Sequence, residues 1–359
     1  MSSILDDLPA LSLSDPQGMS AILAGFDGQL EEALKMDLEL EMPSPGEIRN
    51  ILICGLGGSA IGGNFLRAYL GADLKIPLQV NRNHTLPGFA GASTLAFICS
   101  YSGHTQETLS AFHEARKAGC AVVCWTSNGQ LQDLAKQHGL PCIRVPAGLP
   151  PRTSLGYSTV LLLRVLARLG LVSDRSQEIE DALEGVRNAI EVYRPESPEA
   201  ENEAKQLAKK IHGKIPLIYG SQDRLDVMAV RWRGQFAENG KQLAYSGALP
   251  EMNHNEIVGW KHPSDVLDRL IPIFLRDQDD HPEIQMRIEL TKEFLSKRTG
   301  AVLEYRSQGE GWMDRLWSLV LLGDYASLYL AFLNEENPVS TEVIDEFKAR
   351  LSQRLGAAS

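Results

Sequence analysis

What this sequence lacks excludes several classes of protein. The chain of 359 residues has no long basic run and a formal net charge of -11, so neither nucleic acid nor an anionic membrane surface is an expected partner. Its first residues lack the basic and apolar segments of a signal peptide. No apolar stretch reaches the length of a membrane span, and the longest, residues 317–333, is interrupted by Asp324 and predicts an ordinary buried helix. We therefore expect a cytoplasmic protein that binds no membrane.

Cysteine is scarce and shows no metal-binding pattern. The five cysteines, Cys54, Cys99, Cys120, Cys124 and Cys142, all lie in the first half of the chain, and no two form a CxxC pair. Cys120 and Cys124 are four residues apart, but no histidine or cysteine follows at the spacing of a zinc site. An odd, scattered set in apolar surroundings is typical of reduced, buried thiols, so we expect no metal.

Hydrophobic patterning predicts two α/β units, one after the other. In the first half, short apolar runs with the character of strands occupy residues 48–54, 76–81, 94–100, 121–127 and 142–147. A helix-rich stretch with a break at residues 196–200 follows, and further strands are expected within 214–221, 266–277 and 301–308. Strands that alternate with helices indicate parallel sheets covered on both faces, so we predict an α/β fold with two such sheets.

A glycine-rich stretch, GLGGSAIGG at residues 55–63, follows the first predicted strand. Gly55, Gly57 and Gly58 would let a ligand approach the backbone closely, and Ser59 opens a helix whose N-terminus favours an anion. The spacing fits the GxGxxG motif of nucleotide-binding folds loosely, and no acidic residue ends the next strand. From this stretch alone, a tight structural turn is as good an interpretation as a ligand site.

A second stretch, SYSGHTQET at residues 100–108, gathers hydroxyl groups at another strand end. Ser100, Ser102 and Thr105 stand around Gly103, and Thr105 can cap the helix that follows. A single hydroxyl here would be an ordinary helix cap. Three hydroxyls beside a glycine favour a phosphate monoester, because they donate hydrogen bonds without needing a net positive charge nearby.

Three further side chains are candidates for chemistry. Arg152 follows a pair of prolines, Glu238 lies late in a predicted helix among apolar and amide residues, and His254 stands between Asn253 and Asn255. The ordinary interpretation of each is structural: a loop arginine, a solvated glutamate and a lone histidine. A carboxylate with an imidazole also suits proton abstraction beside a carbonyl, and an arginine can face developing negative charge.

These stretches resemble known families. Residues 100–108 are similar to the Ser-x-Ser-Gly-x-Thr signature of sugar isomerase (SIS) domains, with His104 where many members carry Asn. GLGGSAIGG, PRTSLGYS at residues 151–158 and PEMNHNEIVGW at residues 250–260 resemble the bifunctional phosphoglucose/phosphomannose isomerases of that superfamily. Residues 319–351 are similar to the closing helices of the same family, so the resemblance covers nearly the whole chain.

The resemblance implies a domain organisation. It predicts two tandem SIS subdomains, each a mainly parallel sheet flanked by helices in a flavodoxin-like three-layer sandwich. Residues 1–47 would form a helical lead-in ending in MPSPGE, 48–195 the first subdomain, 196–340 the second, and 341–359 a C-terminal helix packed at the active site. Family members typically form dimers with the site at the subunit interface, which implies a homodimer with shared active sites.

The resemblance also implies a role for each matching residue. Glu238 would be the base that moves a proton between C1 and C2 of a sugar 6-phosphate, and Arg152 would stabilise the enediolate. His254, presented across the dimer contact, would assist ring opening, and Lys348 would lie near the ring oxygen. Thr341 would leave room for both C2 epimers. The 6-phosphate would be held by the remaining matches: Gly57, Gly58, Ser59, Ser100, Ser102 and Thr105.

The implied activity is reversible isomerisation of glucose 6-phosphate and mannose 6-phosphate with fructose 6-phosphate through an enediol or enediolate. Such an exchange needs no metal and no redox cofactor if a base and a charge clamp are present. Two alternatives stay open: a non-catalytic SIS-type sugar-phosphate sensor, and a different SIS sugar-phosphate isomerase. The short acidic N-terminal stretch argues against the first, and the NHNE stretch and two-domain length argue against the second. Ala60 and Met252 depart from the family pattern without removing a chemical group.

Overall fold

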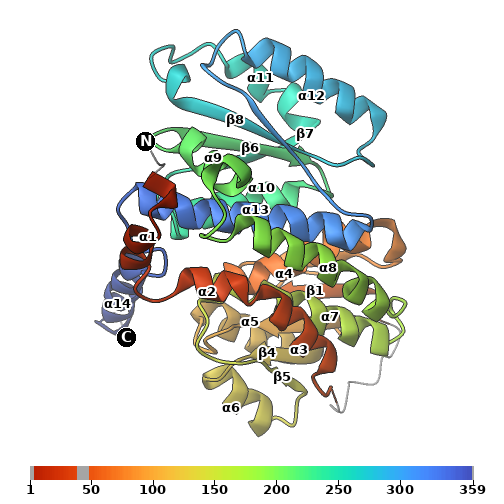
Figure 1. Ribbon diagram of the computed structural model, residues 1–359. Coiled ribbons are helices and arrows are strands. Elements are labelled where there is room, and N and C mark those ends of the chain that lie inside the picture. Colours follow the sequence, from red (N-terminus) through yellow and green to blue (C-terminus); the bar gives the residue numbers. More distant parts are fainter. Residues whose placement is uncertain (1–3, 39–47, 358–359) are drawn as a thin grey trace.

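The computed structural model describes residues 4–38 and 48–357, and it contains two parallel β-sheets with helices between and outside them (Figure 1). The MPSPGE stretch, where the lead-in was expected to end, lies outside the described residues. The predicted fold class is confirmed: each sheet carries helices on both faces, as in a three-layer sandwich.

The first sheet has the strand order of flavodoxin-like folds. Its five strands are β1 (Asn50–Cys54), β2 (Leu78–Asn81), β3 (Thr94–Cys99), β4 (Ala121–Thr126) and β5 (Cys142–Arg144). They are all parallel, in the order β2-β1-β3-β4-β5. The strand order therefore reverses between β1 and β3, which is where folds of this kind bind ligands.

The second sheet is smaller and contains one strand that the sequence pattern missed. Its strands are β6 (Ile215–Ser221), β7 (Tyr245–Leu249), β8 (Leu270–Arg276) and β9 (Leu303–Arg306). They are parallel in the order β7-β6-β8-β9. The missed strand, β7, lies at the edge and has the sequence YSGAL, which is half exposed and has no continuous apolar run. Edge strands with small and polar residues give a weak pattern, because only one face packs against the core.

Helices form three layers around these two sheets (Figure 1). The helices of the middle layer, whose buried side chains share one core with both sheets, are α3 (Phe26–Lys35), α4 (Gly58–Leu70), α7 (Leu155–Arg168), α8 (Ser176–Tyr193), α9 (Glu203–Ile211), α10 (Asp226–Glu238) and α13 (Trp312–Leu333). The outer face of the first sheet is covered by α5 (Gln106–Lys117) and α6 (Gln130–Gln137). The outer face of the second is covered by η5 (Glu251–Asn253), α11 (Glu256–Gly259) and α12 (Pro282–Leu295).

The remaining elements are short or peripheral. They are η1 (Ile4–Asp6), α1 (Leu8–Ser14), α2 (Met19–Ala24), η2 (Gly71–Asp73), η3 (Pro151–Thr153), η4 (Glu199–Glu201), η6 (Leu267–Arg269) and α14 (Glu342–Ala357). Within residues 4–38 of the lead-in, the helices are η1, α1, α2 and α3. Helix α14 extends away from the body of the molecule (Figure 1).

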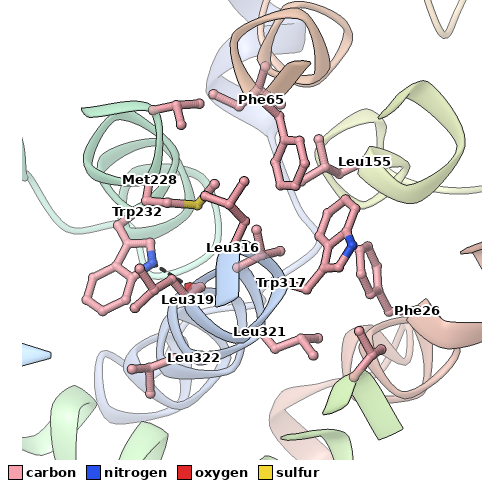
Figure 2. Close-up of a cluster of buried hydrophobic side chains, with 14 of the residues drawn as sticks. Phe26, Phe65, Leu155, Met228, Trp232, Leu316, Trp317, Leu319, Leu321 and Leu322 are labelled. Atoms are coloured by element: carbon pink, nitrogen blue, oxygen red, sulfur yellow. Dashed lines mark hydrogen bonds between the residues drawn. The ribbon is translucent and has the colours of Figure 1, made fainter. Parts of the chain in front are cut away.

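Helix α13 is the centre of the middle layer and confirms the buried helix expected over residues 317–333. Trp317 stacks on Phe65 of α4 with ring centroids 4.2 Å apart, and meets Phe26 of α3 edge to face at 5.2 Å (Figure 2). Trp232 of α10 donates its indole N–H to the backbone oxygen of Leu319 at 2.8 Å (Figure 2). Aromatic contacts of this kind contribute about 0.5–1.5 kcal/mol each, in addition to the free energy of burying their surface. Because α13 contacts α3 of the lead-in, α4 of the first unit and α10 of the second, it joins all three into one core.

The cysteines behave as expected for reduced thiols. All five are free; Cys54, Cys99 and Cys124 are buried, and Cys120 and Cys142 are half-buried. Burial raises the pKa of Cys54 to about 12, so this thiol stays protonated and unreactive at neutral pH.

Candidate active site

The two hydroxyl- and glycine-rich loops lie side by side because the strands before them are neighbours. In the parallel pair β1 and β3, Cys54 is opposite Ile98, so both strands end at the same edge of the sheet. The hydroxyl of Ser59, at the start of α4, accepts a hydrogen bond from the backbone N–H of Tyr101 at 3.1 Å. This bond joins the two loops directly at the point where the strand order reverses.

The hydroxyls of the second loop are arranged in a small network. Ser100 is buried and donates to the hydroxyl of Thr105 at 3.0 Å, while Ser102 is exposed and accepts from the backbone N–H of His104 at 3.3 Å. Thr105 is the N-cap residue of α5, as predicted, although its side chain makes no capping hydrogen bond. Its hydroxyl therefore keeps hydrogen-bonding capacity for a ligand at this helix end.

The first loop packs against the segment that carries Arg152. Gly57 has φ +49°, in the left-handed region that favours glycine. At Gly58 a Cβ would lie 2.3 Å from the backbone oxygen of Pro151 and 2.6 Å from the backbone nitrogen of Arg152. Only glycine fits this approach, so the start of α4 fixes the position of η3.

Arg152 and Glu238, two of the expected catalytic residues, come together in the structure. Nη1 of Arg152 lies 3.5 Å from Oε2 of Glu238, at the last turn of α10. The arginine side chain is 5% exposed and the glutamate side chain 33% exposed. Nε of Arg152 donates to the side-chain oxygen of Asn239. The carboxylate is thus held beside a buried cation while one side of it remains open to solvent.

Burial and two carboxylates have opposite effects on the pKa of Arg152. Burial lowers the pKa of Arg152 below its ordinary value, and Glu238 and Asp324 act to raise it. A guanidinium starts from so high a pKa that it stays charged at any working pH. The site therefore has a permanent positive charge that is buried, and charges interact more strongly in a buried site than in water.

A buried polar network beneath this pair escaped the sequence analysis. Arg231 forms an ion pair with Asp324 of α13, Gln235 donates to the same carboxylate at 2.8 Å, and Asn239 donates to Ser327 at 2.8 Å. Arg231, Gln235 and Asn239 are spaced four residues apart on α10, so they share one face of the helix. That spacing, with Asp324 inside an apolar run, is the signal that could have revealed the network.

The N-terminal lead-in supports the same site. Gln29 of α3 is buried and donates to the backbone oxygen of Thr153 at 2.8 Å, next to Arg152. Gln17 accepts from the side chain of Asn337 at 3.2 Å. The lead-in thus contacts both segments that surround the guanidinium, which gives it a structural role that its sequence did not show.

The other expected site residues are placed differently. Thr341 is half-buried and directly precedes α14. It lies two residues after Val339, whose backbone oxygen accepts from Arg152 at 3.0 Å. Lys348 lies on α14, where every residue from 342 to 354 is exposed. His254 is exposed and follows η5 on the outer layer of the second sheet. Within the described residues of one chain, no hydrogen bond or ion pair joins His254 or Lys348 to the Arg152–Glu238 pair.

The corresponding edge of the second sheet is occupied by ion pairs. After β6 and β8, Asp277 pairs with Arg315 at 2.8 Å and with Arg224 at 2.8 Å, while Asp280 accepts from Ser221 at 2.6 Å. Burial acts to raise the pKa of Asp277, but hydrogen bonds from Ser307 and Arg315 outweigh it and lower the pKa. Carboxylates that stay ionised at this edge make it unsuitable for an anionic ligand.

The tandem of flavodoxin-like sheets, with a hydroxyl-rich loop at the first reversal of strand order, defines a chain built from SIS domains. Residues 200–351 match the family model described as "Bacterial phospho-glucose isomerase C-terminal SIS domain". A solved hypothetical protein from Thermus thermophilus has the same fold, with a TM-score of 0.69, 17% identity, and coverage of 98% of this chain and 90% of that one.

Curated relatives identify the family. The bifunctional phosphoglucose/phosphomannose isomerase of Caldicellulosiruptor bescii is 39% identical over 90% of this chain and 96% of its own. The enzyme of the same name from Aquifex aeolicus is 35% identical over 92% of this chain and 98% of its own. The chain belongs to the family of bifunctional phosphoglucose/phosphomannose isomerases, which confirms the resemblance drawn from its motifs.

Proposed function

We propose that the protein interconverts glucose 6-phosphate and mannose 6-phosphate with fructose 6-phosphate. Membership of a family of bifunctional isomerases supports this activity. The observation that carries the proposal is the pairing of Glu238 with buried Arg152 at 3.5 Å, beside the loop of Gly57 and Gly58. A base, a cation and an anion-binding loop in one place are what aldose–ketose exchange requires.

In this proposal Glu238 carries out the proton transfer. Its carboxylate removes a proton from C2 of the open-chain aldose, which gives an enediolate, and returns it to C1. The hydroxyl proton of O2 passes to O1 in the same exchange, so the carbonyl moves from C1 to C2. Arg152 stabilises the negative charge of that intermediate, because its own charge is permanent and buried. A general base contributes a factor of roughly 10²–10⁴, and a positioned charge about 10²–10³.

The two loops at the edge of the first sheet would hold the 6-phosphate. The start of α4 offers backbone N–H groups, and Ser59, Ser100, Ser102 and Thr105 offer hydroxyls. Anchoring the phosphate orients the reacting carbons against Glu238, since binding energy from the remote group is used to position the substrate. Thr341 would lie near C2, where its short side chain accepts either epimer.

Completion of the site by a second subunit is part of the proposal. His254 would open the sugar ring from the partner chain, and Lys348 would reach the ring oxygen when α14 is packed. Large apolar side chains are exposed on α12, which covers the same sheet face as η5, and on α14: Met286, Leu290 and Phe294 on α12, and Val343, Phe347 and Leu351 on α14. Exposed apolar rows of this kind favour a protein partner, and a homodimer is the partner that we propose.

The proposal uses no metal and no cofactor. It also places the protein in the cytoplasm, without a membrane partner. The apolar helix α13 is long enough to span a bilayer, but 83% of its apolar window is buried between the two sheets, so it is a core helix. The partner that we propose is a small molecule, the sugar phosphate substrate.

The test is a coupled assay that offers glucose 6-phosphate and mannose 6-phosphate separately, with EDTA present. The wild-type protein should convert both to fructose 6-phosphate. Glu238→Gln should bind sugar phosphate and keep the fold but lose kcat by about 10²–10⁴-fold, the contribution of a general base. Glu180→Gln, an exposed position on α8, is the matched control and should keep wild-type turnover. Wild-type kcat in Glu238→Gln would remove the assignment of the base.

Sharing of the site between subunits has its own test. Inactive Glu238→Gln chains mixed with inactive His254→Ala chains should recover part of the activity once mixed dimers form. One of the two sites in such a dimer then combines an intact Glu238 with an intact His254. Mixed dimers that are shown to form but remain inactive would contradict the shared site.

A further inference from the structure

Two cationic side chains hold three successive backbone oxygens. We call residues 337–339 the C-terminal strap. Lys241 donates from Nζ to the backbone oxygen of Asn337 at 2.6 Å, and Nη2 of Arg152 donates to those of Pro338 at 2.8 Å and Val339 at 3.0 Å. The side chain of Asn337 also accepts from the backbone N–H of Val339 at 2.9 Å. The strap is therefore a fixed turn tied to the candidate site by charge-assisted bonds.

Lys241 also binds the helix that carries the base. Its ammonium donates to the backbone oxygen of Glu238 at 2.8 Å, at the C-terminal end of α10. Lys241 has φ +51°, a left-handed conformation that costs free energy for any residue with a Cβ. The residue before it is Gly240, yet the left-handed conformation is adopted by the lysine. A lysine in this strained conformation points to a task for its side chain.

We propose that Lys241 is a positioning residue for the isomerisation. It ties the end of α10, with Glu238, to the C-terminal strap, which leads within two residues to Thr341. The distance between the base and the residue expected at C2 of the sugar is therefore set by this one ammonium, together with Arg152. The proposal rests on the proposed function, and it concerns geometry rather than contact with the reacting atoms.

The charge of Lys241 depends on its surroundings. The ionisable groups that face it are Arg152 from η3, Glu238 from α10, Glu336 before the strap and Glu342 from α14. Burial, followed by the charge of Arg152, lowers the pKa of Lys241 to about 8, against the opposing effect of the three glutamates. Since bonds from a charged donor are stronger than those from a neutral amine, the strap should loosen as the pH rises through that value.

The experiment compares Lys241→Met, Lys241→Gln and Lys241→Arg with wild type and with Lys214→Met. Lys214 is a matched control, because it is exposed and donates to the backbone oxygen of Asp268 at 2.8 Å, in a different part of the fold. For each variant, kcat and KM are measured with both aldose phosphates from pH 6 to pH 9.5, together with thermal unfolding and inhibition by inorganic phosphate.

We expect Lys241→Met to lose about 10- to 100-fold in kcat, the size of effect that a displacement near 1 Å produces. Its preference between the two epimers should change about threefold or more, and the loss of activity near pH 8 that we expect of wild type should be absent. Lys241→Gln, a neutral donor, should be intermediate and without that pH dependence, and Lys241→Arg should recover most of kcat. Phosphate inhibition should stay as in wild type, because the phosphate loops do not contact the strap.

Other outcomes overturn the inference in distinguishable ways. If Lys241→Met is less stable than wild type but keeps its kcat, its epimer preference and its pH profile at temperatures where it is folded, the residue is merely structural. If Lys241→Met behaves as Lys214→Met does, the inference about Lys241 fails and the proposed function stands. If wild type and Lys214→Met convert neither aldose phosphate, the proposed function fails and this inference fails with it.

Discussion

Replacing Gly58 with alanine tests the link between the loop proposed to bind phosphate and Arg152, the arginine proposed to stabilise the intermediate. The added Cβ would lie 2.3 Å from the backbone oxygen of Pro151, where ordinary contact begins near 3.4 Å. The obstacle is backbone, so the start of α4 and η3 must separate by about 1 Å, because no flexible side chain can move aside. Arg152 moves with η3, while the phosphate loop stays bonded to Tyr101 through Ser59.

The expected consequence is larger for catalysis than for stability. A misplacement of about 1 Å between the anchored phosphate and the charge that stabilises the intermediate should lower kcat/KM by about 10²-fold. Overpacking at a tight contact costs about 1–3 kcal/mol, less than the usual free energy of unfolding of about 5–15 kcal/mol, so the variant should still fold.

Kinetics and urea unfolding of Gly58→Ala and Gly234→Ala check this reasoning. Gly234 is a matched control inside α10, where a Cβ would meet nothing within 4 Å. Alanine there should leave kcat/KM unchanged and raise the free energy of unfolding by about 1 kcal/mol through helix propensity. A Gly58→Ala variant with more than half of the wild-type kcat/KM would refute the argument that this close approach sets the position of Arg152.

Three further outcomes are expected. Ser102→Ala combined with Thr105→Ala should raise KM for fructose 6-phosphate by about tenfold or more, because bonds to phosphate are lost; unchanged inhibition by free phosphate would place the phosphate elsewhere. Thr341→Gln should lower kcat/KM for mannose 6-phosphate more than for glucose 6-phosphate, by about 1–3 kcal/mol, and equal losses would remove the specificity role. Asp324→Ala should lower the free energy of unfolding in urea by about 3–5 kcal/mol, because it leaves Arg231 buried without its ion-pair partner. Adding Arg231→Met to Asp324→Ala should restore a large part of that free energy, and no restoration would contradict the ion-pair explanation.

Much of the fold was predictable because buried segments appear in the sequence as regular patterns of apolar residues. The central strands of the first sheet, β1, β3 and β4, are buried almost throughout, so each shows as a nearly continuous apolar run in the sequence. The second sheet was less predictable at its edge, where β7 includes Gly247 close to the ring of Tyr219. A glycine that makes room for an aromatic ring has no signature that a single sequence reveals.

The candidate site was partly predictable, for a different reason. Motifs pointed to Arg152 and Glu238, and the structure places them 3.5 Å apart. Periodicity could not show that Lys241 reaches back over the end of α10 to Asn337, 96 positions away in the sequence. Such contacts depend on how distant segments cross, which the local pattern does not encode. The position of Lys348 over a site likewise stays a prediction, because α14 is exposed along its length in the single chain.

Both sheets are parallel and have helices on both faces, but the edges at which their strands end differ in charge. This difference explains how the two halves of the chain can have different roles in the proposed function. At the first edge the side chains are uncharged hydroxyls, so a phosphate there meets the N–H groups of α4 without repulsion. At the second, a phosphate would approach the carboxylates of Asp277 and Asp280, which already form ion pairs with Arg315 and Arg224. The arginines at that edge are already engaged by these carboxylates, so they are not available to a ligand. The second half therefore contributes through the end of α10, where Glu238 meets Arg152 from the first half, and the proposed mechanism accordingly has one such pair per chain.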